Sequence, residues 1–107
     1  MYKQGSIVLI PFPFTDLSGV KVRPAVIVSS KTIGDDIIVA FISTNTKKKG
    51  KFEVFLKMNT ENGLKSNSVV VVSKIATLEK KTILGEIGQV SHVEIEQIQG
   101  KIKSLFL

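Results

Sequence analysis

Apolar residues in this chain are gathered in short runs that are separated by turn-forming residues. The runs that predict β-strands are Ser6–Ile10, Pro24–Ser29, Ile37–Ile42, Phe52–Leu56, Ser68–Val72 and Ile83–Val90. Each run is far shorter than the ~20 residues of a membrane-spanning helix, and the runs follow one another too closely for crossover helices. The pattern therefore predicts a mainly β domain whose strands form a small, strongly bent barrel.

Proline and small polar residues set the expected limits of these strands. Pro11 and Pro13 are expected to end the first strand, and Pro24 suits the first residue of the second because it lacks an N–H. Turn-forming or connecting segments are predicted at Thr15–Gly19, Gly34–Asp36 and Lys80–Lys81. Thr60–Leu64 predicts a single helical turn that is capped by Thr60.

The C-terminal segment has the periodicity of a helix. Ser91 and Glu94 have the spacing of a capping box, in which each side chain accepts a hydrogen bond from the other residue's free backbone N–H. The apolar residues that follow lie on one face at helical spacing: Ile95, Ile98, Ile102 and Leu105. We therefore expect a single domain over residues 1–107, mainly β with a C-terminal helix.

Composition narrows the classes of partner and compartment. The chain has 107 residues, of which 43% are hydrophobic, and it has no cysteine, so disulfides and thiolate metal sites are excluded. The formal net charge of +6 favours an acidic partner, either a nucleic acid or an acidic protein. The N-terminus lacks the pattern of a signal peptide, and we expect a soluble cytoplasmic protein.

Several common kinds of catalytic site are missing. The single histidine, His92, excludes a paired-histidine mechanism and is best read as a surface or capping residue of the predicted helix. Asp35 and Asp36 are adjacent, so on a strand they would point to opposite sides and do not converge on a metal. Gly85 and Gly88 fit neither the P-loop nor the Rossmann spacing. We expect no metal and no cofactor.

The densest charge cluster is the run Lys47-Lys48-Lys49-Gly50-Lys51. It is interpreted either as a solvated hairpin loop or as a phosphate contact on the rim of a nucleic-acid groove. The segment Ser43–Thr46 places hydroxyl groups and an amide directly beside this charge. The run alone does not decide between the two interpretations.

Arg23 is the only arginine among fifteen basic residues. The following Pro24 restricts its backbone to an extended conformation. A guanidinium is planar and forked, and it binds pairs of phosphate oxygens that an ammonium binds less well. Arg23 is therefore either a surface residue in an ion pair or a phosphate-binding residue with a restricted backbone.

Several motifs together resemble the MazF/PemK family of toxins from type II toxin–antitoxin systems. They are Gly5–Val8, Pro11–Gly19, Arg23–Ser29, the segment VAFIST at 39–44 and the stretch from 68 to 91. The resemblance implies an SH3-like small barrel, a homodimer and metal-independent endoribonuclease activity on single-stranded RNA. It also implies an antitoxin partner with an acidic, largely disordered tail, and DNA binding together with that antitoxin.

The resemblance also implies which residues form the site. The family's active-site arginine corresponds to Arg23. Its active-site hydroxyl residue corresponds to Ser43, and Thr44 is the next residue along the chain. The loop 12–22 corresponds to the family's loop beside the active site. Ser18 stands where some members have an acidic residue, and Asp16 is the nearest carboxylate. The expected RNA contacts are Thr15, Asp16, Lys21, Pro24, Asn45, Lys47, Lys48, Lys49 and Lys74.

Cleavage without a metal can use the 2′-hydroxyl of the RNA as nucleophile, which leaves a 2′,3′-cyclic phosphate and a 5′-hydroxyl. In this scheme Arg23 stabilises charge on the phosphate and Ser43 orients it. A guanidinium is a poor proton donor, and Asp16 is only a candidate for the general base. Two other interpretations stay open: a non-catalytic SH3-like module that binds RNA or an acidic peptide through a basic groove, and a purely structural barrel. The sequence does not indicate the cleavage motif.

Overall fold

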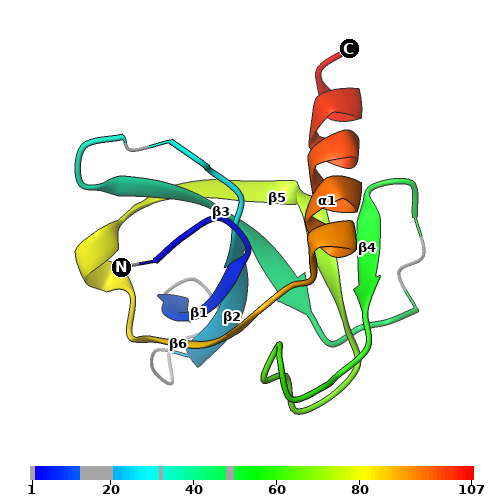
Figure 1. Ribbon diagram of the computed structural model, residues 1–107, viewed down its shortest axis with the longest axis horizontal. Helices are drawn as coiled ribbons and strands as arrows, with labels where there is room; N and C mark the ends of the chain where they lie inside the picture. The colour runs from blue at the N-terminus through cyan, green and yellow to red at the C-terminus, as the bar shows by residue number, and fades with distance from the viewer. Residues whose placement is uncertain (1, 13–20, 32, 48–49) are drawn as a thin grey trace.

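The computed structural model describes residues 2–12, 21–31, 33–47 and 50–107, which form one curled antiparallel sheet and a C-terminal helix (Figure 1). The strands are β1 (Ser6–Phe12), β2 (Lys21–Ile27), β3 (Asp36–Ser43), β4 (Glu53–Leu56), β5 (Ser68–Glu79) and β6 (Gly85–Gln89). A short 3₁₀ helix, η1 (Lys80–Thr82), joins β5 to β6, and the helix α1 spans His92–Leu105. The sheet order in this described part is β4-β5-β3-β2-β1-β6, which makes a half-barrel with β4 and β6 at its edges. The predicted fold class is confirmed.

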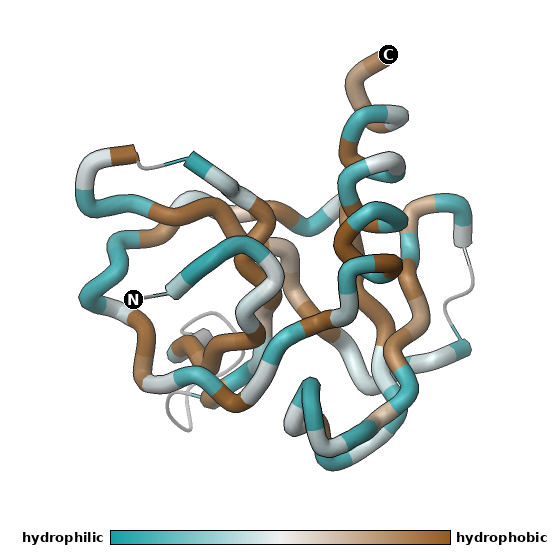
Figure 2. Tube along the Cα trace, viewed as in Figure 1, coloured by the Kyte–Doolittle hydropathy of each residue, from teal (hydrophilic) through white to brown (hydrophobic). Residues whose placement is uncertain are grey.

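The central strands are buried on both faces, and this explains why they are continuous apolar runs in the sequence. Val26, Ala40 and Ile42 belong to a first core, which packs against α1 and β4. Ala25 and Val39 belong to a second core on the opposite face. Figure 2 shows the hydrophobic runs crossing the middle of the sheet, while hydrophobic and hydrophilic residues alternate along the helix.

Both proline boundaries were wrong. β1 continues through Pro11 to Phe12, and β2 begins at Lys21, so that Pro24 lies inside it. β6 pairs only with the first part of β1, and β3 pairs with β2 only from Ala25 onward. Each proline therefore lies where its strand has one hydrogen-bonded neighbour instead of two. On the side without a neighbour, the missing N–H of proline costs no hydrogen bond.

β5 is much longer than the predicted run, because it continues from Ser68 to Glu79. Its pairing with β3 shifts between Phe41, which is opposite Val71, and Ala40, which is opposite Ile75. Residues 72–74 therefore form a bulge that bends β5, so that β5 follows the curl of the sheet and pairs with β3 on both sides of the bend. After the bend, η1 occupies the predicted connector at Lys80–Lys81.

The predicted single helical turn is present, since the Gly63 N–H donates to the Asn59 carbonyl at 3.1 Å, but its cap is Asn59 and not Thr60. Asn59 and Asn62 each accept a hydrogen bond from the other's backbone N–H through their side-chain oxygens, at 3.1 and 2.7 Å. Asn62 also accepts from the Leu64 N–H and donates to the Lys57 carbonyl, although its side chain is almost completely buried. Gly63 then has a φ of +68°, which no regular helix allows. The two asparagine side chains therefore cap a single helical turn, which ends at Gly63.

The predicted turn before β3 is present. The Asp36 N–H donates to the Ile33 carbonyl at 3.0 Å, and Gly34 has a φ of +58° within the turn. Asp36 itself begins β3. Across the described ranges of the chain, no helix combines the length and the apolar character that a membrane crossing requires.

The C-terminal helix begins with the predicted capping box. The Ser91 hydroxyl accepts from the Glu94 N–H at 3.1 Å, and the Glu94 carboxylate accepts from the Ser91 N–H at 2.8 Å. His92 is the first helical residue, and its exposed Nε2 lies 3.3 Å from the Glu96 carboxylate. The predicted apolar face packs onto the first core, with Ile98 fully buried.

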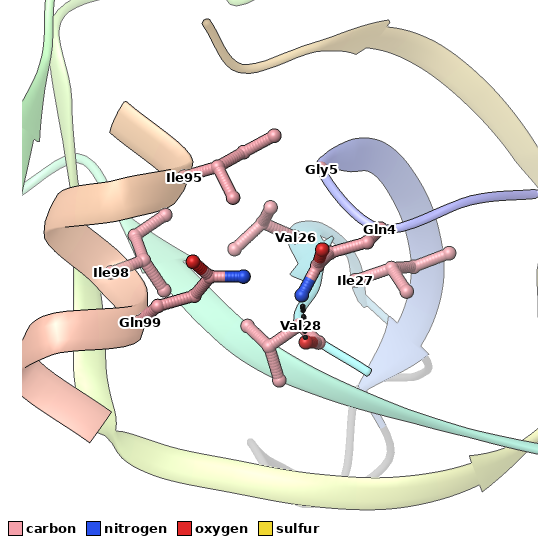
Figure 3. A pocket seen from close by; sticks show the side chains of 8 residues that line it. All are labelled: Gln4, Gly5, Val26, Ile27, Val28, Ile95, Ile98 and Gln99. Atoms are coloured by element: carbon pink, nitrogen blue, oxygen red, sulfur yellow. Dashed lines mark hydrogen bonds between the residues drawn. The ribbon is translucent and has the colours of Figure 1, made fainter. Parts of the chain in front are cut away.

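The helix docks beside the N-terminal segment, as Figure 3 shows. Ile95 and Ile98 face Val26 and Val28 there, and the Gln4 side-chain amide donates to the Val28 carbonyl at 2.9 Å. Gly5 is required at this contact: its φ is +91°, and a Cβ would lie 2.7 Å from the Ile95 side chain. The helix is therefore held close against the backbone of residue 5.

Replacing Ser91 with alanine is expected to lower the free energy of unfolding by about 1 kcal/mol, because the Glu94 N–H loses its cap. Ser104→Ala is the matched control on the same helix. Its hydroxyl only donates back to the Lys101 carbonyl, so alanine should be neutral or slightly stabilising. Urea denaturation of both variants measures the difference; equal midpoints would show that the capping box adds no stability.

Candidate functional site

The site lies at the end of the sheet where β2 and β3 separate. The two strands pair at Ala25–Ile27 with Val39–Phe41, and this pairing does not extend to Arg23 and Ser43. Lys21–Pro24 pairs with β1 alone, while Ile42 and Ser43 pair with β5 alone. Continuing the register of the paired section places Arg23 level with Ser43. Beyond Ala25 and Phe41 the two strands no longer pair with each other, and we call this end of the sheet the opening; each strand carries one predicted catalytic residue there.

Alternation along the strands places the two residues on the same face. Arg23 is two residues from Ala25 and opposite Ile10, both of which belong to the second core. Ser43 is two residues from Phe41, which packs against that same core. Arg23 and Ser43 are each half-buried. Register and alternation therefore place Arg23 and Ser43 level with each other on one face of the sheet.

Thr44 and Pro24 lie on the other face. They line a cavity of about 400 Å³ together with Val22, which is two residues from Pro24 along β2. The predicted catalytic set is therefore divided by the sheet: Arg23 and Ser43 are on one side, and Thr44 is on the other. The side chain of Thr44 is exposed in the bend that follows β3.

The chain after β3 is organised by Ser43 and Asn45. The Ser43 hydroxyl accepts from the Asn45 N–H at 3.1 Å, and the Asn45 side-chain oxygen accepts from the Lys47 N–H at 3.3 Å. Both predicted contacts, Asn45 and Lys47, are exposed. A serine that accepts such a bond has its oxygen held in place and keeps its own hydrogen for donation to another group.

The predicted lysine contacts come from three elements. Lys21 is exposed at the start of β2, Lys47 follows β3, and Lys74 is exposed in the β5 bulge beside Phe41. Because β3 lies between β2 and β5, these cations flank the strand that carries Ser43. Four further predicted contacts, Thr15, Asp16, Lys48 and Lys49, lie outside the described residues. So does most of the loop 12–22, whose ends are strand residues of β1 and β2.

Sequence reasoning missed the wall of the cavity. The segment from Gly63 to Ser66 lies across from Val22 and Pro24, with Leu9, Ser68 and Ile87 completing the lining. The signal that could have found this segment was Asn59-x-x-Asn62-Gly63, since asparagine favours the start of a helical turn and glycine its end. In the described part of the chain, no three acidic or histidine side chains gather in a group that could hold a metal ion.

Comparison with known proteins identifies the family. Solved structures of similar fold include the Mycobacterium tuberculosis toxin MazF-mt6, with a TM-score of 0.74 and 22% identity, covering 94% of this chain and 95% of that one. MazF from Deinococcus radiodurans has a TM-score of 0.75 and 19% identity, with coverages of 97% and 94%. An endoribonuclease from a mycobacterial species, in complex with its cognate antitoxin, has a TM-score of 0.75 and 20% identity, with coverages of 97% and 93%.

At these identities the structural likeness shows the fold. No curated protein is similar enough in sequence to match the chain. Residues 3–106, nearly the whole chain, match the family described as PemK-like, MazF-like toxin of type II toxin–antitoxin system. The chain therefore belongs to the PemK-like, MazF-like toxin family.

Proposed function

We propose that this chain is the toxin of a type II toxin–antitoxin system, and that it is a metal-independent endoribonuclease for single-stranded RNA. The observation that carries the proposal is the level placement of Arg23 and Ser43 on one face, across the opening between β2 and β3. A forked cation and a held hydroxyl on either side of an opening suit a phosphodiester between them. Family membership and the fold support the same function.

In this reaction the 2′-oxygen of the RNA attacks the adjacent phosphorus, and the bond to the 5′-oxygen of the next nucleotide breaks. Arg23 binds the nonbridging oxygens as they gain charge, and Ser43 donates a hydrogen bond that orients the phosphate. The 2′-hydroxyl loses a proton, and the departing 5′-oxygen gains one. The products are a 2′,3′-cyclic phosphate and a 5′-hydroxyl.

The test is incubation of the pure protein with single-stranded RNA, duplex RNA and single-stranded DNA, each in excess EDTA. We expect cleavage of the single-stranded RNA alone, since DNA lacks the nucleophile and a duplex does not enter the opening. Cleavage of DNA would rule out the proposed nucleophile. Tight RNA binding with no cleavage would instead favour the non-catalytic binding module.

We further propose that the protein acts as a homodimer. The domain is small, and apolar side chains stay exposed at the C-terminal end, where Phe106 is 77% and Leu107 91% exposed. Burial of these groups against a second copy would extend the apolar stripe of α1. Sedimentation at micromolar concentration should give the mass of two chains; the mass of one chain would contradict this.

The proposed protein partner is an antitoxin with an acidic segment. This segment would compete with RNA for the lysine-rich run that begins at Lys47. The net charge of +6 favours capture of such a segment through electrostatic steering. Neutralising Lys47, Lys48 and Lys49 together should weaken binding of an acidic peptide and of RNA, and both losses should shrink as salt rises. If both affinities are unchanged at low salt, the binding surface does not include this run.

A further inference from the structure

The cavity on the far side of the sheet from Arg23 has no role in the chemistry proposed above. We propose that it binds one unpaired RNA base, belonging to a nucleotide next to the phosphate that Arg23 contacts, and that its lining sets the base preference of the enzyme. This inference rests on the proposed RNA-cleaving function and adds a binding site to it.

The position of the cavity is the first argument. It is lined by Val22 and Pro24, the two neighbours of Arg23 on β2, and by Thr44, the neighbour of Ser43. Consecutive residues of a strand point to opposite faces, so the cavity begins on the other side of the same short stretch of backbone. β2 begins at Lys21 and β3 ends at Ser43, so both faces meet at one rim of the sheet. A nucleotide with its phosphate at Arg23 can turn its base over this rim.

The second argument is the chemistry of the lining. Its floor and sides are apolar, with contributions from Leu9, Val22, Pro24, Leu64 and Ile87. Polar groups are few and come from Thr44, Lys65, Ser66 and Ser68. Unpaired bases are recognised in this way, by contact with their flat faces and by hydrogen bonds at their edges. The buried Ser68 hydroxyl donates to the Ser66 carbonyl at 3.0 Å, and its oxygen can still accept a hydrogen bond from a base.

The third argument is that the outer wall is held rigidly before any ligand binds. Asn62 closes the segment from Lys57 to Leu64 through its buried side chain. A Cβ at Gly63 would lie 2.0 Å from the Ile87 carbonyl oxygen, so the segment packs directly on β6. The Gln89 N–H also donates to the Glu61 carbonyl at 3.0 Å. A preformed wall binds a ligand without the entropy cost of ordering a loop.

Charge favours a nucleotide over an apolar side chain of a protein partner. Lys65 lines the cavity, and Lys21 begins β2 at the same rim on the face of Arg23, so one cation stands at the apolar space and another across the rim. A nucleotide supplies an anionic backbone and a flat apolar base within a single unit. That combination matches the two features of the cavity.

The test is an abasic scan with 2′-fluoro RNA, which lacks the proposed nucleophile and is not cleaved. The oligonucleotide covers the site at which the wild-type protein cuts a long RNA, and one base is removed at each position in turn. For the wild-type protein, loss of one base next to the cleaved bond should weaken binding about tenfold, the usual contribution of a stacked base. In Leu64→Trp, which fills the cavity, removal of that base should have no effect.

Leu84→Trp is the matched control, because Leu84 is 60% exposed and does not line the cavity. It should keep the wild-type profile. Ser66→Trp fills the cavity from an exposed position and replaces Leu64→Trp if that variant does not fold. A flat wild-type profile overturns the inference. If removal of the base still weakens binding in the filled variants, the inference is also overturned, because the base then binds outside the cavity. If the wild-type protein cleaves RNA and one of these two profiles is found, only the base-binding inference is rejected. If the protein neither binds nor cleaves RNA, the proposed function is rejected as well.

Discussion

Replacing Arg23 with lysine or with alanine is expected to abolish RNA cleavage while the protein stays folded. Lysine keeps the positive charge but loses the planar fork, so it cannot hold two nonbridging oxygens at once. Loss of one well-placed electrostatic contact lowers a rate by ~10²–10³, which is enough to silence a slow enzyme. Residue 23 stays extended before Pro24 in either variant, and its pairing with β1 uses backbone groups only. Single-turnover cleavage measures the effect.

Binding of uncleavable RNA in the same buffer is the control. The lysine variant should bind nearly as well as the wild type, because one phosphate contact among several depends mainly on charge. Ser43→Ala should show a smaller loss of rate, and Ser43→Thr should preserve or raise activity because the hydroxyl is retained. Near wild-type cleavage by Arg23→Lys would mean that Arg23 contributes only charge, and the binding-module interpretation would then replace the catalytic one.

Replacing Gly63 with alanine is expected to lower the free energy of unfolding by about 3 kcal/mol. The backbone of Gly63 has a φ of +68°, which costs an alanine roughly 1–2 kcal/mol. The new Cβ would also lie 2.0 Å from the Ile87 carbonyl oxygen, so the wall of the cavity and β6 must move apart. The midpoint of urea denaturation measures the loss, provided that the slope of the transition is unchanged.

Gly85→Ala is the matched control for this prediction. Gly85 lies in β6, the strand that Gly63 contacts, but an added Cβ at Gly85 meets no atom within 4 Å, so the stability of the variant should change little. RNA binding should fall in Gly63→Ala and not in Gly85→Ala, since only the former displaces the cavity wall. If both variants unfold at the same urea concentration, the contact between residue 63 and β6 is not the tight one described above.

The general architecture could be predicted because it depends on local patterns. Buried strands are continuous apolar runs, and α1 carries both its capping box and its apolar stripe within residues 91–105. Strand limits were harder, since proline excludes only one of the two hydrogen-bonding sides of a strand. Pro11 and Pro24 are accommodated because β6 and β3 stop short of them, and the sequence of β1 or β2 does not contain that fact.

The site could be predicted only in part, for the same reason. Arg23 and Ser43 were identified through resemblance, but their level placement depends on the register of β2 with β3. Thr44 lies on the opposite face, which follows from strand alternation once that register is known. The wall from Gly63 to Ser66 was missed because its conformation depends on side-chain bonds of Asn59 and Asn62 and on contact with Ile87. The asparagine bonds are local, but the contact with Ile87 joins distant parts of the chain and leaves only a weak signal in the residues themselves.

The most direct test of the central claim is cleavage of an RNA that carries a single 2′-deoxynucleotide on the 5′ side of the cleaved bond, with EDTA present. We predict that the unmodified RNA yields a 2′,3′-cyclic phosphate and a 5′-hydroxyl, and that the substituted bond stays intact. Cleavage of the substituted bond, or products with a 5′-phosphate, would contradict attack by the 2′-hydroxyl between Arg23 and Ser43.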